Sequence, residues 1–205
     1  MDKVQQTFTE VFQEQRWGSG ESVSGTGSSL KATVELIPQL LSLVAERSIG
    51  SFVDAPCGDF NWIGPVARAV DSYTGLDIVE EVVRKASERA AHDGVERANF
   101  SVANIISDDL PAADLFLVRD CIVHLAFDQG VVALNNVRTK SKWLLTTTFP
   151  DLADNRDVKT GQWRPLNLQL APFNFSSPIQ LIVERPSIPP HEKWGRKCLG
   201  LWGRV

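Results

Sequence analysis

Cysteine is scarce in this chain, which has only three in 205 residues. Cys57, Cys121 and Cys198 are odd in number and widely separated, unlike the cysteines of a disulfide framework. No two of them form the CxxC pair that is typical of a zinc site. We therefore expect three reduced thiols.

Long apolar runs are also missing, and the longest falls well short of a membrane span. Residues 1–15 alternate charged and amide side chains with a few apolar ones, so they lack the apolar centre of a secretory signal. The hydrophobic fraction of 43% is ordinary for a globular protein, and the length suits one compact domain. We expect a cytoplasmic protein with no membrane partner.

Basic residues form no block, and the net charge is −4. A broad positive surface for duplex nucleic acid is therefore missing. A small or neutral substrate fits this balance better, and we expect no nucleic-acid partner. The sequence gives no indication of an oligomeric state.

From residue 48 onward, strand and helix patterns alternate, which indicates a parallel sheet covered on both faces. The most regular helix pattern covers 78–92, where apolar residues recur at helical spacing and charges point outward. Strands are predicted at 50–54, 72–77, 99–102, 114–118, 142–148, 179–184 and 197–202, and other helices at about 61–70 and 129–139.

Two segments depart from this alternation. Residues 16–30 are rich in Gly and Ser and cannot hold a regular helix or strand, whereas 33–45 suits a helix with Pro38 near its start or at a kink. Between 149 and 177 the periodicity disappears, over a length that is unusual for an idle loop. We interpret 149–177 as a substrate-facing insertion.

The turn after the first predicted strand, VDAPCGDF, has the features of a ligand-binding turn. In a doubly wound sheet, ligands bind beyond the carboxyl ends of the strands. Gly58 would let the backbone approach a ligand closely, and Asp54 ends the strand beside it. Asp77 ends the second strand, where a carboxylate can accept hydrogen bonds from both hydroxyls of a ribose.

A dinucleotide site is the competing interpretation, but its GxGxxG pattern is missing. Gly58 is the only glycine of the turn, and Pro56, Asp59 and Trp62 stand where the cradle for a pyrophosphate would be. In a purely structural alternative, Gly58 only turns the chain and Asp77 caps the helix that follows.

Four successive segments, VDAPCGDFNW, YTGLDIVEE, NFSVANI and DLFLVRDCIVHL, resemble the motifs of class I S-adenosylmethionine-dependent methyltransferases. The resemblance covers about 48–148. It implies a Rossmann-like, doubly wound α/β fold whose seven-stranded sheet is mostly parallel, with one antiparallel strand near the C-terminus. It also implies S-adenosylmethionine as cofactor and S-adenosylhomocysteine as product. The implied contacts are Asp54, Ala55, Gly58 and Arg119 along the methionine part, Asp77 and Ile78 at the ribose and adenine, and Asn104 and Ile105 at the adenine edge.

The family often has an acid at the position of Asn104, although an amide oxygen could still accept the hydrogen bond. The segments WGSGES, CGDFNW and KCLGLW together resemble a small bacterial branch of these enzymes. By that resemblance, 1–47 forms a helical segment and a cofactor-covering arm in which Trp17, Ser19 and Glu21 close the pocket, and 48–205 forms the methyltransferase domain. In the alternative, the arm is a flexible segment.

A hydroxyl acceptor needs a base. His124 in RDCIVHL is the best candidate, because imidazole titrates near neutrality and the segment follows the fourth strand. Asp120 could orient His124 or act in its place. The alternative is a buried structural histidine.

The 149–177 insertion begins with an acidic stretch, and its oxygens could bind Mg²⁺ or Ca²⁺. Acidic turns are commoner, so we assign no metal ligands. Aromatic faces with amides and an arginine would suit a sugar or another polyhydroxylated acceptor, or equally a loop packed on the core. The possible metal ligands of the acidic stretch are Asp151, Asp154, Asn155 and Asp157. The aromatic, arginine and amide side chains that could face an acceptor are Trp163, Arg164, Asn167, Phe173 and Phe175.

These patterns predict an S-adenosylmethionine-dependent methyltransferase that acts on a small molecule, with O-methylation of a sugar or another hydroxylated metabolite as the specific expectation. The alternative is a protein that binds the cofactor without turnover and acts as a regulatory or scaffold partner. A nucleic-acid methyltransferase is disfavoured by the acidic balance, and because RDCIVH stands where an Asn/Asp-Pro-Pro-aromatic motif would be.

Overall fold

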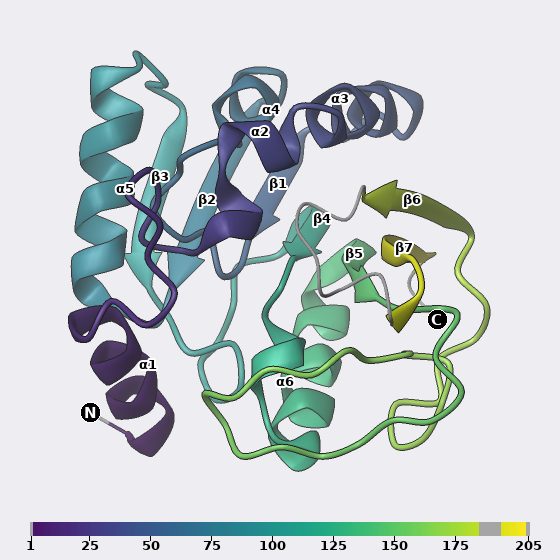
Figure 1. Cartoon of the computed structure of the whole chain (residues 1–205). Coiled ribbons are helices and arrows are strands. Elements are labelled where there is room, and N and C mark those ends of the chain that lie inside the picture. The colour runs from purple at the N-terminus through teal and green to yellow at the C-terminus, as the bar shows by residue number, and fades with distance from the viewer. Residues whose placement is uncertain (1, 185–193, 204–205) are drawn as a thin grey trace.

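The computed structural model describes residues 2–184 and 194–203, and its centre is a seven-stranded sheet (Figure 1). The strand order is β3-β2-β1-β4-β5-β7-β6. Because β7 pairs antiparallel with both of its neighbours while the other pairings are parallel, the predicted Rossmann-like α/β fold is confirmed. The strands are β1 (Ser51–Asp54), β2 (Ser72–Asp77), β3 (Ala98–Val102), β4 (Ala113–Val118), β5 (Ser141–Thr148), β6 (Gln180–Glu184) and β7 (Lys197–Gly203).

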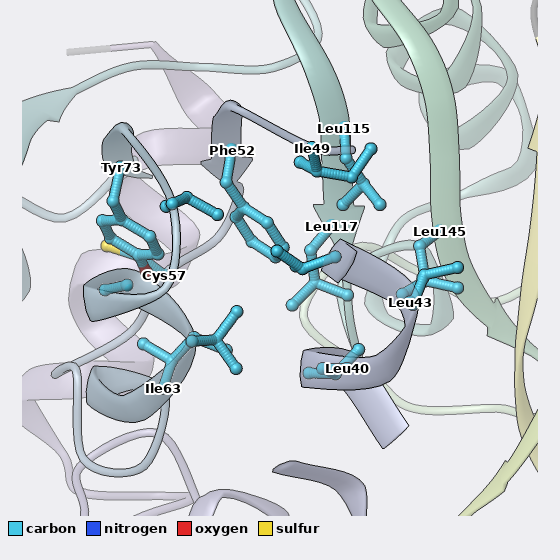
Figure 2. Close-up of a cluster of buried hydrophobic side chains, with 14 of the residues drawn as sticks. Leu40, Leu43, Ile49, Phe52, Cys57, Ile63, Tyr73, Leu115, Leu117 and Leu145 are labelled. Atoms are coloured by element: carbon cyan, nitrogen blue, oxygen red, sulfur yellow. The ribbon is translucent and has the colours of Figure 1, made fainter. Parts of the chain in front are cut away.

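The central strands are apolar on both faces because helices cover both. On one face, Phe52, Leu115 and Leu117 pack with residues of three helices, α3 (Leu36–Glu46), α4 (Gly64–Arg68) and α5 (Glu80–His92), as Figure 2 shows for Leu40 and Leu43 of α3. On the other face, the alternate strand residues pack with α6 (Phe127–Lys140) and with the 149–177 segment. Alternation along each strand therefore divides the core into two layers.

Three helices differ in extent from the prediction, each for a local reason. The helix predicted at 33–45 is divided into α2 (Leu30–Thr33) and α3, and Pro38 lies in the first turn of α3, where proline is tolerated. The helix after β1 is short and begins only at Gly64, after Phe60 has taken a positive φ of 58°. The helix after β2 begins at Glu80, because Val79 is still extended.

Helix α1 (Lys3–Gln13) was not predicted. Its charged and amide residues give it a polar average, but Val4, Phe8, Val11 and Phe12 recur at the spacing of one helix face. Val4 and Phe8 pack against the hydrophobic layer that contains α6. The helix begins after Asp2, whose side chain accepts a hydrogen bond from the Gln5 backbone N–H at 2.8 Å.

The 149–177 segment contains no helix or strand but is closely packed. Leu166 and Leu168 are fully buried, and Phe149 donates its backbone N–H to Leu166 O at 2.7 Å. Residues 1, 185–193 and 204–205, which belong to the predicted arm and domain, lie outside the described residues. In the part of the chain that is described, no helix is long and apolar enough to cross a membrane.

Candidate active site

A cavity of about 630 Å³ opens at the carboxyl ends of the parallel strands. It lies where the chain order reverses, since β2 and β3 follow on one side of β1 whereas β4 and β5 follow on the other. Asp54 and Asp77 end β1 and β2, and Asn104 and Arg119 follow β3 and β4. All four line this cavity.

Most of the predicted site residues meet here. Ala55 instead is fully buried, with its backbone N–H donating to Leu117 O at 2.9 Å. Ser19 faces a second hollow beside α2 and forms a tight turn with Ser22. The predicted residues that line the main cavity are Trp17, Asp54, Gly58, Asp77, Ile78, Asn104, Ile105, Arg119, Asp120 and His124.

Asp77 connects the first two strand ends. Its carboxylate accepts the backbone N–H groups of Val79 at 3.0 Å and Gly58 at 3.2 Å. Burial raises the pKa of Asp77 to about 6, although these backbone donors oppose the shift. Each carboxylate oxygen keeps capacity for a second hydrogen bond.

Asp54 is buried beside Tyr73, whose hydroxyl donates to Asp54 Oδ2 at 2.8 Å. Burial raises the pKa of Asp54 to about 7, against the opposing effects of Tyr73 and the Arg119 charge. Asp54 and Asp77 therefore face one cavity, and in both the cost of burying a negative charge exceeds the stabilisation by neighbouring groups. A ligand with a positive charge and hydroxyl donors would stabilise both in their ionised forms.

The side-chain amide of Asn104 has a fixed orientation. Its Oδ1 accepts the Ile106 backbone N–H at 3.0 Å, and its Nδ2 donates to Asp2 Oδ2 at 2.8 Å. A backbone N–H only donates and a carboxylate only accepts, so both contacts determine the same amide orientation. Gln5, in the first turn of α1, donates its side-chain amide to Ile78 O at 3.1 Å.

Arg119 belongs to a buried network of charges that sequence reasoning missed in part. Its guanidinium donates twice to Glu184 Oε2, at 2.5 and 3.0 Å, and once to Gly27 O at 2.9 Å. Lys197 Nζ donates to Asp120 Oδ2 at 2.6 Å and to Glu184 Oε2 at 3.4 Å. Glu184 ends β6 and Lys197 begins β7; no motif indicated Glu184, and Lys197 begins the segment KCLGLW without having been predicted as a site residue.

Asp120 is a charged residue in a strained conformation. Its φ is 52°, in the left-handed region that few non-glycine residues adopt, and its backbone N–H donates to Thr147 Oγ1 at 2.8 Å. Burial would raise the pKa of Asp120, but the charges of Lys197 and Arg119 outweigh burial and lower it below its usual range. Asp120 is therefore a weak base.

His124 lies in the short helix η2 (Ile122–His124) with one ring nitrogen engaged. Its Nδ1 is 3.1 Å from Gln162 O, and because a carbonyl only accepts, the Nδ1 atom carries the proton and Nε2 keeps its lone pair. Burial lowers the pKa of His124 to about 4, so the ring is neutral at pH 7. Among the described residues, Gln162 rather than Asp120 orients this imidazole.

The segment that joins α1 to α2, purple in Figure 1, covers the first strand-to-helix turn. Ser22 Oγ and the Val23 backbone N–H donate to Asp59 at 2.8 and 3.1 Å, and Asp59 N–H donates to Ser24 Oγ at 3.2 Å. Gly58 has a φ of 56°, and a Cβ there would collide with Ser24 Oγ. The glycine thus allows the segment that joins α1 to α2 to approach this turn.

Trp17 completes the wall on the other side, where its ring lies 4.2 Å from that of His124 between centroids. From the 149–177 segment, only Trp163 and Phe149 of the aromatic residues line the cavity in the described part of the chain. Arg164, in contrast, is buried beneath η2 and donates to Ile122 O at 2.7 Å. Phe173 and Phe175 pack in the core, and Asn167 makes backbone contacts within the loop.

The acidic residues of that segment are engaged by protein partners. Asp151 pairs with Arg196 at 2.6 Å, and Asp157 accepts the Phe127 backbone N–H at 2.9 Å. Asp154 pairs with its neighbour Arg156 at 3.3 Å. In residues 2–184 and 194–203, no group of three or more His, Cys, Asp or Glu side chains could hold a metal ion.

No model of a known protein family matches this chain. Among curated proteins, a 23S rRNA (uracil(1939)-C(5))-methyltransferase, RlmD, from Vibrio vulnificus (strain CMCP6) is 31% identical over 78 residues. That match covers 38% of this chain but only 18% of the relative, so the chain spans a small part of that protein.

Solved structures resemble much more of the chain. Magnesium protoporphyrin IX methyltransferase from Synechocystis PCC 6803, with bound S-adenosylhomocysteine, matches with a TM-score of 0.68 and 12% identity over 98% of each chain. The N-methyltransferase NodS from Bradyrhizobium japonicum WM9 matches with a TM-score of 0.58 and 14% identity, over 69% of this chain and 73% of NodS. The chain therefore has the Rossmann-like fold found in S-adenosylmethionine-dependent methyltransferases.

Proposed function

We propose that this protein is an S-adenosylmethionine-dependent methyltransferase that methylates a hydroxyl group of a small molecule, such as a sugar or another hydroxylated metabolite. The observation that carries the proposal is the convergence of Asp54, Asp77, Asn104 and Arg119 from four strand ends on one cavity that also contains His124. In a fold shared with such methyltransferases, this is the edge where a ligand binds.

The donor set fits the cofactor. Asp77 has acceptor capacity for the two ribose hydroxyls, and the apolar Ile78 and Ile105 offer faces for the adenine ring. Asp54 provides a buried carboxyl group for the positively charged methionine end. When bound, S-adenosylmethionine would supply an electrophilic methyl group on a sulfonium, with S-adenosylhomocysteine as the product.

His124 is the proposed base. Gln162 O holds the proton on Nδ1, so Nε2 has the lone pair that would take the proton of an acceptor hydroxyl. The low pKa of His124 limits its strength but keeps the ring neutral and ready to accept. Asp120, held by Lys197, is the weaker candidate and would position the acceptor.

Aromatic side chains shape the acceptor end of the cavity. Trp17, Phe149 and Trp163 offer flat faces, and the charged groups of Asp120 and Lys197 offer hydrogen bonds beside them. A sugar or a similar hydroxylated compound combines an apolar face with a polar rim and would match this combination. The arm would close over both ligands and exclude water during an in-line displacement.

Titration calorimetry with S-adenosylmethionine, followed by a screen of sugars and small hydroxylated metabolites for S-adenosylhomocysteine release, tests the proposal. We expect binding that Asp77→Ala severely weakens, and we expect His124→Ala to keep cofactor affinity but lose turnover. Absence of binding to the unmodified protein would refute the cofactor assignment. Binding with no release from any acceptor would favour a regulatory protein without turnover.

A further inference from the structure

The first turn of α1 meets the proposed adenine end of the cavity. Asn104, which is 92% buried, lines the cavity and donates its amide to Asp2 Oδ2 at 2.8 Å. One turn of helix later, Gln5 donates to the carbonyl of Ile78, another lining residue, at 3.1 Å. The bond that Asp2 accepts and the bond that Gln5 donates thus hold this end of α1 against two residues that line the cavity, Asn104 and Ile78.

Asn104 presents the wrong polarity for an adenine amino group. Its Oδ1 is directed at the Ile106 backbone N–H, and its Nδ2 donor is directed at Asp2. The exocyclic amino group of adenine is itself a donor, so it would face another donor if Asn104 acted alone. An acceptor beside Asn104 would therefore recognise this group better than Asn104 alone, because Oδ1 already accepts the Ile106 N–H and Nδ2 is a donor.

The other carboxylate that contacts Asn104 is already engaged. Asp108 Oδ2 accepts the Asn104 backbone N–H at 2.8 Å, and its Oδ1 accepts Ser107 Oγ at 2.9 Å. Both bonds close the loop after β3, which directs Asp108 to its own backbone. Asp77, the next acid along the cavity, accepts from Gly58 and Val79 and serves the ribose in the proposed function.

Asp2 has the capacity that Asp108 lacks. Oδ1 caps the Gln5 backbone N–H, whereas Oδ2 accepts from Asn104 and, as a carboxylate oxygen, can accept a second donor. The Gln5 backbone donor and the Asn104 amide lower the pKa of Asp2, so the group is ionised at neutral pH.

We propose that Asp2 accepts a hydrogen bond from the adenine amino group of the cofactor and so makes α1 the element that selects adenine. The inference rests on the proposed cofactor. Asn104 then acts as a positioning residue, since its amide directs Asp2 Oδ2 toward the base. An acid from the N-terminal helix would replace the acid that the resemblance leads one to expect at position 104.

The test compares two ligands by titration calorimetry: S-adenosylhomocysteine and S-inosylhomocysteine, in which a carbonyl oxygen replaces the amino group. A hydrogen bond to a charged acceptor predicts that the unmodified protein binds the adenosyl ligand about tenfold to a hundredfold more tightly. Asp2→Asn and Asp2→Ser keep a good helix cap but remove the carboxylate, so both should bring the two affinities close together.

Glu10→Gln is the matched control, because Glu10 is an exposed acid on the same helix and should leave both affinities unchanged. If the Asp2 variants retain the preference of the unmodified protein, Asp2 does not select the base, although the cofactor assignment stands. If the unmodified protein binds neither ligand, the proposed function itself fails. Equal affinities in the unmodified protein would also overturn the role of Asp2.

Discussion

The imidazole of His124 lies against the indole of Trp17, with 4.2 Å between ring centroids and 34° between their planes. Trp17 also contacts Phe8 of α1, with 5.8 Å between their centroids. The proposed base is therefore partly covered by a residue of the arm. Its protonation depends on whether the arm is docked, since burial is the main cause of its low pKa.

Trp17→Ala should raise the pKa of His124 from about 4 towards its ordinary value, because the substitution exposes the ring to water. Nuclear magnetic resonance of the histidine ring nitrogens across a pH titration measures this directly. Trp143→Ala is the control, since Trp143 packs against Arg47 on a different part of the sheet. A His124 that already titrates near pH 6.5 in the unmodified protein would contradict the burial that we describe.

Gly58→Ala should loosen the arm, because the new Cβ would collide with Ser24 Oγ and the positive φ would be strained by about 1 kcal/mol. We expect faster proteolysis at 18–27 and weaker cofactor binding. Adding Ser24→Gly to this variant should slow the proteolysis again, since it removes the atom that collides. Unchanged cleavage in Gly58→Ala would show that the arm does not depend on this contact.

Cofactor affinity should increase with pH between 5 and 8. Burial raises the pKa of Asp77 to about 6 and that of Asp54 to about 7 in the free protein, so both acids bind protons at pH 5. A ligand that requires both carboxylates must displace these protons at low pH, and we expect binding of S-adenosylhomocysteine to be about two to three orders of magnitude weaker at pH 5 than at pH 7. Calorimetry at several pH values measures the trend, and Asp77→Asn should reduce its slope. A flat profile would mean that neither acid changes protonation on binding.

Arg119→Met should destabilise the protein by about 3 kcal/mol, because it leaves the buried Glu184 carboxylate with Lys197 as its remaining described cationic partner. Urea unfolding measures the loss. Combining it with Glu184→Leu should recover most of the stability, since the unpaired charge is then gone. If the double variant is no more stable than Arg119→Met, the ion pair does not account for the loss.

The sheet could be predicted because its central strands are buried on both faces and separated by clear turns. Helix α5 followed from a regular apolar stripe. Helix α1 was missed because its polar residues outweigh the stripe of Val4, Phe8 and Val11 in any average over the segment. Only the helical spacing of these apolar residues indicated a helix.

The strand-end acids of the site followed from the order of the motifs, whereas their partners did not. Gln162, Glu184 and Lys197 reach the site through the packing of the 149–177 segment and the β6–β7 pair, and such contacts leave no periodic trace in the sequence. The same holds for Asp2, which contacts Asn104 although 102 residues separate them. Contacts between residues so far apart in the sequence arise only when the chain folds.

That separation has a consequence for biosynthesis. The arm leaves the ribosome before its anchors, Asn104, Arg119 and His124, which are made about 5 to 20 s later at ordinary elongation rates. During that interval the apolar side chains of α1 and Trp17 have no place to pack. The newly made arm is thus a part of the chain that we expect chaperones to bind, and a slowed ribosome before β4 would prolong its exposure.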